Sequence, residues 1–258
     1  GALVNGASCI DEEQPCICYS SSGAVDVEVC IQGDGSDLLA EPMLDLMCVC
    51  ATLCDARGAP CVRGLDGGVR PPSGDDTRFA SAAPAEQPAE ALRRTWSRPS
   101  LSITQVGQGL VHDLGRGAAQ QASCIVSLRT APSQSGDEVA GALHRHLRHE
   151  FETRGPSNRL ETRTRVASGP WQAKTSSRAY LAAKAAVAQA WGLEVLEVRE
   201  GRAVPVLPVL EAELGCDAVL MPLGQARLPD ERVTAKALAH GIDAIVGALL
   251  GLADAPAE

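Results

Sequence analysis

Residues 194–224 carry the pattern that most constrains the fold of this chain. An apolar run at 194–198 leads into an Arg-Glu-Gly turn, and two prolines then fall early in an amphipathic helix. A second apolar run at 218–223 ends at Gly224. Strand, glycine turn, helix, strand and glycine turn in succession are typical of an open α/β sheet, whose ligands lie beyond the carboxyl ends of its strands. We therefore predict an α/β protein with both glycine turns at the edge where a site would lie.

Composition limits the classes of partner. The 258 residues are 45% hydrophobic, which is enough to bury a substantial core in one large domain or two small ones. The formal net charge of −9 argues against nucleic acid or an anionic membrane as the main partner. The longest apolar run, 242–252, is shorter than the roughly 18 residues of a membrane span and contains Asp243. We predict no membrane span and no signal peptide, and we expect an upstream part because the chain does not begin with Met.

The ten cysteines are many for this length. Cys16 and Cys18 share one face if they lie on a strand, and Cys48, Cys50 and Cys54 fall on an expected helix. Structural zinc sites usually pair two Cys-x2-4-Cys units, or one unit with histidines, and two Cys-x-Cys units fit that spacing poorly. We favour small buried thiols in a reducing intracellular compartment, the cytoplasm or an organelle matrix, over a structural metal site.

Residues 137–152 predict an amphipathic helix that carries three histidines. We expect its buried face to contain Val139, Leu143, Leu147 and Phe151. His144, His146 and His149 resemble a metal cluster, but at i, i+2 and i+5 they do not converge on one helix face. We predict that they belong to a mainly solvated face, together with Arg145 and Arg148.

The Arg-Glu-Gly segment, REGRAVP at 199–205, resembles the REGGSIP turn of a family of di-zinc metallopeptidases. This is the carnosine dipeptidase, Cys-Gly metallodipeptidase and aminoacylase family, and in particular its glutathione-degradosome branch. Residues 221–233, MPLGQARLPDERV, are similar to the family's LPMGQASDNAHLPNERI, whose His ligates zinc. Here Ala226 is followed directly by Arg227, so the residues that would hold this His are missing.

Other segments extend the resemblance over most of the chain. Residues 14–19 resemble the family's DDxxPCLTYG, and residues 96–103, WSRPSLSI, resemble WRSPSLTV. The family's Asp ligand would precede the first of these segments, where this chain offers only Asn5 or Gly6. The chain has no His-x-Asp, and the family's HxD and Glu-Glu motifs would lie before residue 1. The family uses two zinc ions, but we expect no cofactor, no metal ligand and no catalytic residue in this chain.

The resemblance also implies the architecture. It predicts part of a zinc-peptidase catalytic sheet with an inserted α+β lid, or dimerisation, domain. Residues 1–15 would be a remnant of the catalytic domain, 16–169 the lid with a mobile loop at 73–95, and 170–258 the C-terminal part of the catalytic domain.

Within the lid we expect a βαββαβ order of elements. Its first strand is expected at 24–31 and its last at 160–166, where apolar residues alternate with polar ones. Glu41 and Pro42 are expected to open the first helix. The apolar positions of that helix are Met43, Leu44, Met47, Cys48, Ala51 and Leu53. The chain would close with a helix at 232–252 whose core stripe is Ala237, Leu238, Ile242, Ile245, Val246 and Leu249.

The candidate site residues lie on the substrate side. Arg129 matches the arginine of the family's SLR segment and would pair with a peptide carboxylate, or else form a salt bridge within the lid. Glu200, Gly201 and Ala203 match the REGGS turn, which would hold the termini of the substrate. Arg202 stands where the family has Gly and would fill the pocket, and Ala203 lacks the hydroxyl of the family's Ser.

These features lead to two hypotheses on function. The first is a non-catalytic homologue that acts through its lid, as a homodimer or as a scaffolding subunit of a larger protein complex. The alternative is a fragment of an active di-zinc dipeptidase for Cys-Gly or a similar substrate, completed by an upstream segment. The missing His near Gln225 counts against the alternative, because an upstream segment would not restore it. Short losses at two loops would also fit a faulty gene model.

Overall fold

A computed structural model describes residues 1–5, 14–33, 40–65, 99–113, 117–131, 134–223 and 233–253. The expected mobile loop at 73–95 lies outside these ranges. So does the junction of Ala226 and Arg227, where the family's zinc-ligating His is missing from this chain. The chain divides into two compact units. Unit 1 comprises Gly1–Ser22, Arg70–Arg98 and Pro170–Glu258, and unit 2 comprises Gly23–Val69 and Pro99–Gly169. Strand β2 (Cys16–Gln32) contributes its first part to unit 1 and the rest to unit 2.

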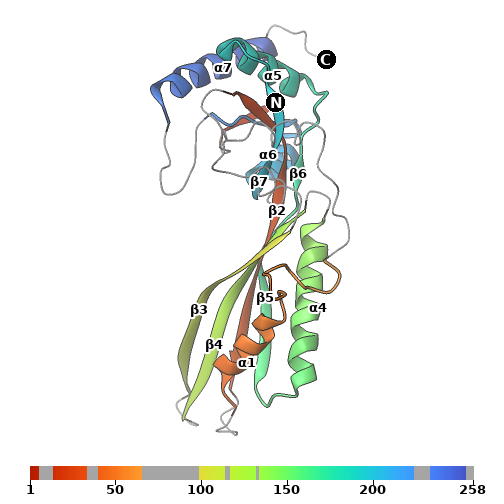
Figure 1. The fold of residues 1–258 in the computed structure, drawn as a ribbon, viewed down its shortest axis with the longest axis vertical. Helices are drawn as coiled ribbons and strands as arrows, with labels where there is room; N and C mark the ends of the chain where they lie inside the picture. The colour runs from red at the N-terminus through yellow and green to blue at the C-terminus, as the bar shows by residue number, and fades with distance from the viewer. Residues whose placement is uncertain are drawn as a thin grey trace. The chain divides into compact units, whose positions relative to one another are not determined.

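Unit 1 is built on a mixed sheet (Figure 1). Its strands besides β2 are β1 (Ala2–Val4), β6 (Trp171–Gln172), β7 (Leu196–Ala203) and β8 (Ala218–Leu220). β7 runs parallel to β2, whereas β6 is antiparallel to it. β8 pairs with β1 in parallel and meets β2 in antiparallel orientation at Cys18 and Leu220. β7 and β8 therefore run in opposite directions, so their carboxyl ends do not lie at one edge of the sheet as the prediction of a shared edge requires; Gly224 itself lies outside the described residues.

Helices α5 (Arg178–Trp191), α6 (Val206–Leu214) and α7 (Ala235–Ala253) complete unit 1. The sequence specifies both ends of α5. The Ser177 side chain accepts a hydrogen bond of 3.2 Å from the backbone N of Tyr180, and Gly192 ends the helix at a φ of 66°.

α7 forms as predicted, but its predicted core stripe is wrong. The helix buries small residues, Gly241, Ala244 and Ala248, and packs against α5 (Figure 1). A Cβ added to Gly247 would lie 3.1 Å from the Cβ of Ala186, so the two helices approach closely where side chains are small. Ile245 is partly buried against the core. The other large aliphatic residues of the stripe are exposed: Leu238, Ile242, Val246 and Leu249.

By length and composition, α7 is the one helix in the described ranges that could cross a membrane. Core helices of soluble proteins meet the same criterion, so this is weak evidence, and the expectation of no membrane span stays a prediction.

Unit 2 has the predicted βαββαβ order. Its elements are the rest of β2, α1 (Pro42–Ala51), β3 (Ser100–Asp113), β4 (Gly117–Thr130), α4 (Gly136–Arg154) and β5 (Arg159–Ser168). The strands form an antiparallel sheet in the order β5-β2-β4-β3. α1 and α4 cover one face of it (Figure 1). Alternate residues of β2, from Val25 to Ile31, point into the core beneath these helices.

α1 begins where predicted but buries a different face. The Glu41 carboxylate accepts a hydrogen bond of 3.3 Å from the backbone N of Met43 and caps the helix. The buried residues are Pro42, Asp45, Leu46, Val49 and Cys50, whereas Leu44 and Met47, predicted for the core, are 59% and 41% exposed. Periodicity could not select the face, because apolar residues surround the whole helix and the one acidic residue, Asp45, points inward.

α4 buries Val139, Leu143, Leu147 and Phe151, as predicted. The expectation that His146 points outward is wrong, since its side chain is only 4% exposed. Its Nε2 lies 2.9 Å from the Oγ1 of Thr52, and its Nδ1 accepts a hydrogen bond of 3.4 Å from the backbone N of Arg63. These contacts join the helix to the segment that follows α1.

Candidate functional site

The Arg-Glu-Gly segment forms part of strand β7 and not the turn that the sequence predicts. β7 stays paired with β2 through Ser20 with Arg199 and Ser21 with Glu200, and pairing resumes at Ser22 with Ala203. Two residues, Gly201 and Arg202, are thus inserted between successive pairs, which makes a bulge. The strand continues because β2 offers a partner beyond the end of the apolar run.

Two charged residues of the bulge, Glu200 and Arg202, bind each other. One carboxylate oxygen of Glu200 accepts hydrogen bonds from the backbone N of Arg202, at 2.9 Å, and from the Nε of Arg202, at 3.3 Å. The Glu200 side chain is mostly buried, whereas that of Arg202 is about half exposed. Gly201 is buried and Ala203 partly buried. Glu200, Gly201, Arg202 and Ala203 therefore form one local structure in which the acid already has an intramolecular partner.

A second contact beside the bulge was not predicted from sequence. The Nε of Arg199 donates a hydrogen bond of 2.6 Å to the hydroxyl of Tyr19, and its guanidinium carbon lies 5.5 Å from the centroid of that ring. Tyr19 belongs to the segment that resembles the family's DDxxPCLTYG, so this resemblance was the one signal that could have paired it with residues 199–203.

Several polar groups are buried in unit 1 without a hydrogen-bond partner. Within the described ranges, the hydroxyls of Ser20 and Tyr180 and the indole N–H of Trp171 have no hydrogen-bond partner. Burial is the main cause that raises the pKa of Tyr180, and the negative charge of Glu197 raises it further. Glu197 is itself paired with Lys184 at 3.0 Å. Buried groups of this kind are usually satisfied by ordered water.

Among the described residues, Asn5 is a poor candidate for a zinc ligand. Asn5 follows β1, and its Oδ1 accepts a hydrogen bond of 3.4 Å from the backbone N of Leu223, beyond the end of β8. A neutral amide that is bound to the backbone is a poor substitute for a carboxylate ligand. Within the ranges that the structure describes, no three His, Cys, Asp or Glu side chains are grouped as a metal ion would require. Residues 6–13 and 224–232 are not described.

Arg129 belongs to unit 2, whereas residues 200–203 belong to unit 1. It is exposed on β4, where it is in register with Ala24 of β2 and Ser100 of β3. The surroundings of each candidate are therefore described within its own unit.

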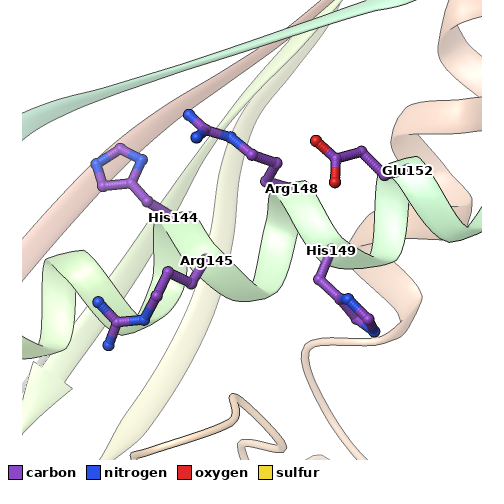
Figure 2. A pocket seen from close by; sticks show the side chains of 5 residues that line it. All are labelled: His144, Arg145, Arg148, His149 and Glu152. Atoms are coloured by element: carbon purple, nitrogen blue, oxygen red, sulfur yellow. The ribbon is translucent and has the colours of Figure 1, made fainter.

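The charged face of α4 forms a shallow hollow of about 190 Å³. Figure 2 shows His144 and Arg148 on one side of the helix axis and Arg145 and His149 on the other. His144 is held by two threonine hydroxyls of β5, since its Nδ1 lies 2.7 Å from Thr162 and its Nε2 lies 2.7 Å from Thr164. The imidazoles do not converge, and His144 and His146 support the packing of α4.

Comparison with known proteins agrees with this fold. No family model matches the chain. The chain is 24% identical to the probable di- and tripeptidase DUG2 of Saccharomyces cerevisiae, over 87% of this chain and 27% of that protein. It is 25% identical to the Cys-Gly metallodipeptidase DUG1 of Candida albicans and 27% identical to human Beta-Ala-His dipeptidase. These two alignments cover 82% and 83% of this chain, and 49% and 47% of the relatives.

Two solved structures are similar over nearly the whole chain. Human carnosine dipeptidase 1 superposes with a TM-score of 0.79 at 23% identity, covering 98% of this chain and 59% of that one. Dug1p from Saccharomyces cerevisiae also gives a TM-score of 0.79, at 20% identity, covering 99% of this chain and 59% of that one.

The fold is a mixed α/β fold that matches part of an M20 peptidase chain. The proteins that are similar in sequence are dipeptidases or di- and tripeptidases, a narrower class than the M20 peptidases as a whole. The chain is a homologue of the M20 dipeptidase family, to which the carnosine and Cys-Gly dipeptidases belong. It spans about half the length, or less, of the curated relatives that it matches.

Proposed function

We propose that this M20 dipeptidase homologue acts without catalysis, as a dimerising or scaffolding subunit. The observation that carries the proposal is the hydrogen bond that the side chain of Asn5 accepts from the backbone. The resemblance places an acidic zinc ligand at Asn5 or Gly6, neither of which is acidic, and the side-chain oxygen of Asn5 accepts a hydrogen bond of 3.4 Å from the backbone N of Leu223. A neutral amide cannot supply the negative charge with which a metallopeptidase holds its metal ions.

The substrate-side residues support the same proposal. One oxygen of the Glu200 carboxylate already accepts hydrogen bonds from two donors of Arg202, whose positive charge would compete with the amino group of a substrate. The Arg202 side chain, which the family replaces by Gly, supplies one of these donors. The retained REG motif thus serves the packing of β7 more directly than the binding of a peptide.

Unit 2 offers a surface for association. The outer face of α1 exposes Leu44 and Met47 beside a hollow of about 420 Å³, lined by Glu41, Met43, Leu44, Met47 and Gln108. Strand β3 lies at the edge of the sheet, where its outer backbone groups can pair with another strand. An exposed apolar helix face next to a sheet edge suits a two-fold contact with a second copy of the chain.

Light scattering coupled to size-exclusion chromatography tests this association. We expect the chain to be a dimer or a larger assembly, and the double variant Leu44→Asp and Met47→Asp to be a monomer. Leu181→Asp is a matched control, because Leu181 is also exposed but lies on α5 in unit 1. A monomeric native chain that binds two zinc ions and hydrolyses Cys-Gly or β-Ala-His would contradict the proposal.

The second candidate is a fragment of an active di-zinc dipeptidase, with Cys-Gly or a similar substrate, completed by another segment. The incomplete burial of unit 1 favours it. α6 buries only Leu207 and leaves Val206, Val209 and Leu214 exposed, and α7 exposes most of its large residues. Fusion to the part of human carnosine dipeptidase 1 that this chain does not cover tests this candidate. Zinc-dependent turnover would support it, and a fusion that folds without turnover would favour the non-catalytic role.

A further inference from the structure

Two buried thiols face each other in the core of unit 2. Cys50 lies on α1 and Cys124 on β4, and their Sγ atoms are 3.7 Å apart. Cys50 is 5% exposed and Cys124 is 1% exposed. Neither belongs to the candidate site, and both belong to the hydrophobic core under α1 and α4.

The fold itself brings these thiols together. β4 points Ala122, Cys124, Val126 and Leu128 into the core, because alternate residues of a strand share a face. α1 points Leu46, Val49 and Cys50 at that surface. Other cysteines are placed differently: Cys48 is partly buried on another side of α1, and Cys61 is exposed.

We propose that Cys50 and Cys124 are a site of disulfide formation, which links α1 to β4 when the protein meets a peroxide. A disulfide requires the two Sγ atoms to approach to about 2.05 Å. Side-chain rotation at Cys50 and a small shift of α1 would supply the remaining approach from 3.7 Å. This inference rests on unit 2 alone and does not depend on the proposed function.

The reaction balances with hydrogen peroxide as the oxidant. The Cys50 sulfur, as its thiolate, attacks one peroxide oxygen and breaks the O–O bond, which gives a sulfenic acid and, after protonation, one water. The Cys124 sulfur then attacks the Cys50 sulfur, and the hydroxyl group leaves as a second water after taking the Cys124 proton. Two thiols lose two electrons, and one peroxide is reduced to two waters.

Cys50 is the thiol that reacts first. It is the more exposed of the two, so a small oxidant reaches it sooner. The hydrogen bond with Cys124 lowers the pKa of Cys50, which favours its thiolate, whereas the pKa of Cys124 is raised by the same contact and by burial. Cys124 therefore acts as the resolving thiol.

Peptide mapping of the native full chain tests the proposal. The chain is treated with hydrogen peroxide, free thiols are alkylated, and the protein is digested without reduction by trypsin and an Asp-specific protease. Residues 117–129 form a peptide whose single cysteine is Cys124. We expect it to be linked to residues 45–54 through Cys50, and the link to disappear on reduction. The link should raise the midpoint of thermal unfolding by about 5 °C.

Variants assign the link within the second peptide, which also contains Cys48 and Cys54. Cys50→Ala should abolish the link and the rise in midpoint, and the matched control Cys48→Ala should retain both. Should Cys50→Ala fail to fold, fragment-ion assignment in the wild-type peptide decides the same point. Oxidation of the exposed Cys61 with Cys50 and Cys124 still alkylatable after unfolding would overturn the proposal, as would a link that forms only in denaturant.

Discussion

Asp45 accepts a buried hydrogen bond of 2.8 Å at its Oδ2 from the side-chain Nδ2 of Asn158. Its other oxygen accepts a hydrogen bond of 3.1 Å from Arg154, at the end of α4. The one acidic residue of α1 thus points toward the protein and joins this helix to the C-terminal end of α4. This contact explains why the buried face of α1 includes Asp45 and excludes Leu44 and Met47.

The substitution Asp45→Ala should lower the free energy of unfolding by about 1.5–3 kcal/mol, because a buried amide loses a charged hydrogen-bond partner. Chemical denaturation monitored by circular dichroism measures this change. Glu161→Ala is the control, since Glu161 forms an exposed pair with Arg159 and should change stability by less than about 0.5 kcal/mol. Equal stability of Asp45→Ala and the wild type would show that this contact is not needed.

His146 should make unit 2 less stable in mild acid. Burial lowers the pKa of His146 below its ordinary value, and burial and Arg148 do the same for His144. A histidine in the unfolded chain has a pKa of about 6.5. Near and below this pH the unfolded state therefore binds more protons than the folded state. The stabilisation is complete above about pH 7 and is lost as the pH falls from about 6.5 toward the folded pKa.

Thermal unfolding between pH 7.5 and pH 5 measures this effect. We expect the midpoint to fall with pH in the wild type and to fall less in His146→Gln, which removes one of the two titrating groups. His149→Gln changes an exposed residue of the same helix and should leave the wild-type dependence in place. An unchanged slope in His146→Gln would exclude His146 as a cause.

Gly23, the first residue of unit 2 on β2, lies where there is no space for a side chain. An added Cβ would overlap with the backbone oxygen of Ser168 and would lie 2.5 Å from the Oγ1 of Thr130. Gly23→Ala should therefore destabilise the protein by about 1–3 kcal/mol, because backbone must move. Gly107→Ala on β3 is the matched control, since nothing lies within 4 Å of its added Cβ. Denaturant midpoints compare the two variants, and similar values would contradict this account.

The elements that sequence predicted best have both a periodic pattern and specified ends. α4 combines a clear apolar stripe with an end at Gly155, a residue of positive φ. The alternation of apolar and polar residues likewise predicted the second part of β2 and strand β5. Local patterns suffice in these cases, because one face of each element is polar and the other apolar.

Properties that depend on distant partners were not predictable. The direction of β8 relative to β2 is set by pairing between Cys18 and Leu220, which are remote in sequence. The Glu200–Arg202 contact depends on a bulge that β2 imposes on β7. The resemblance pointed to the segments of the candidate site, but it could not show which of their side chains are already engaged within the chain.

α7 provides the last prediction, because its exposed residues distinguish a surface from a core. Ile242 and Leu249 are each about half exposed, whereas Ala244 is fully buried against the core of unit 1. Ile242→Lys with Leu249→Lys should leave the unfolding free energy of the chain within about 1 kcal/mol of the wild type, since both sites are solvated. It should also lower the binding of a dye that reports exposed apolar surface and raise the concentration at which the chain aggregates.

Ala244→Lys, the matched control on the buried face, should unfold unit 1, because an unpaired charge would enter its core. If the double variant unfolded as Ala244→Lys does, the predicted core stripe of α7 would be right and the buried glycine and alanine face wrong.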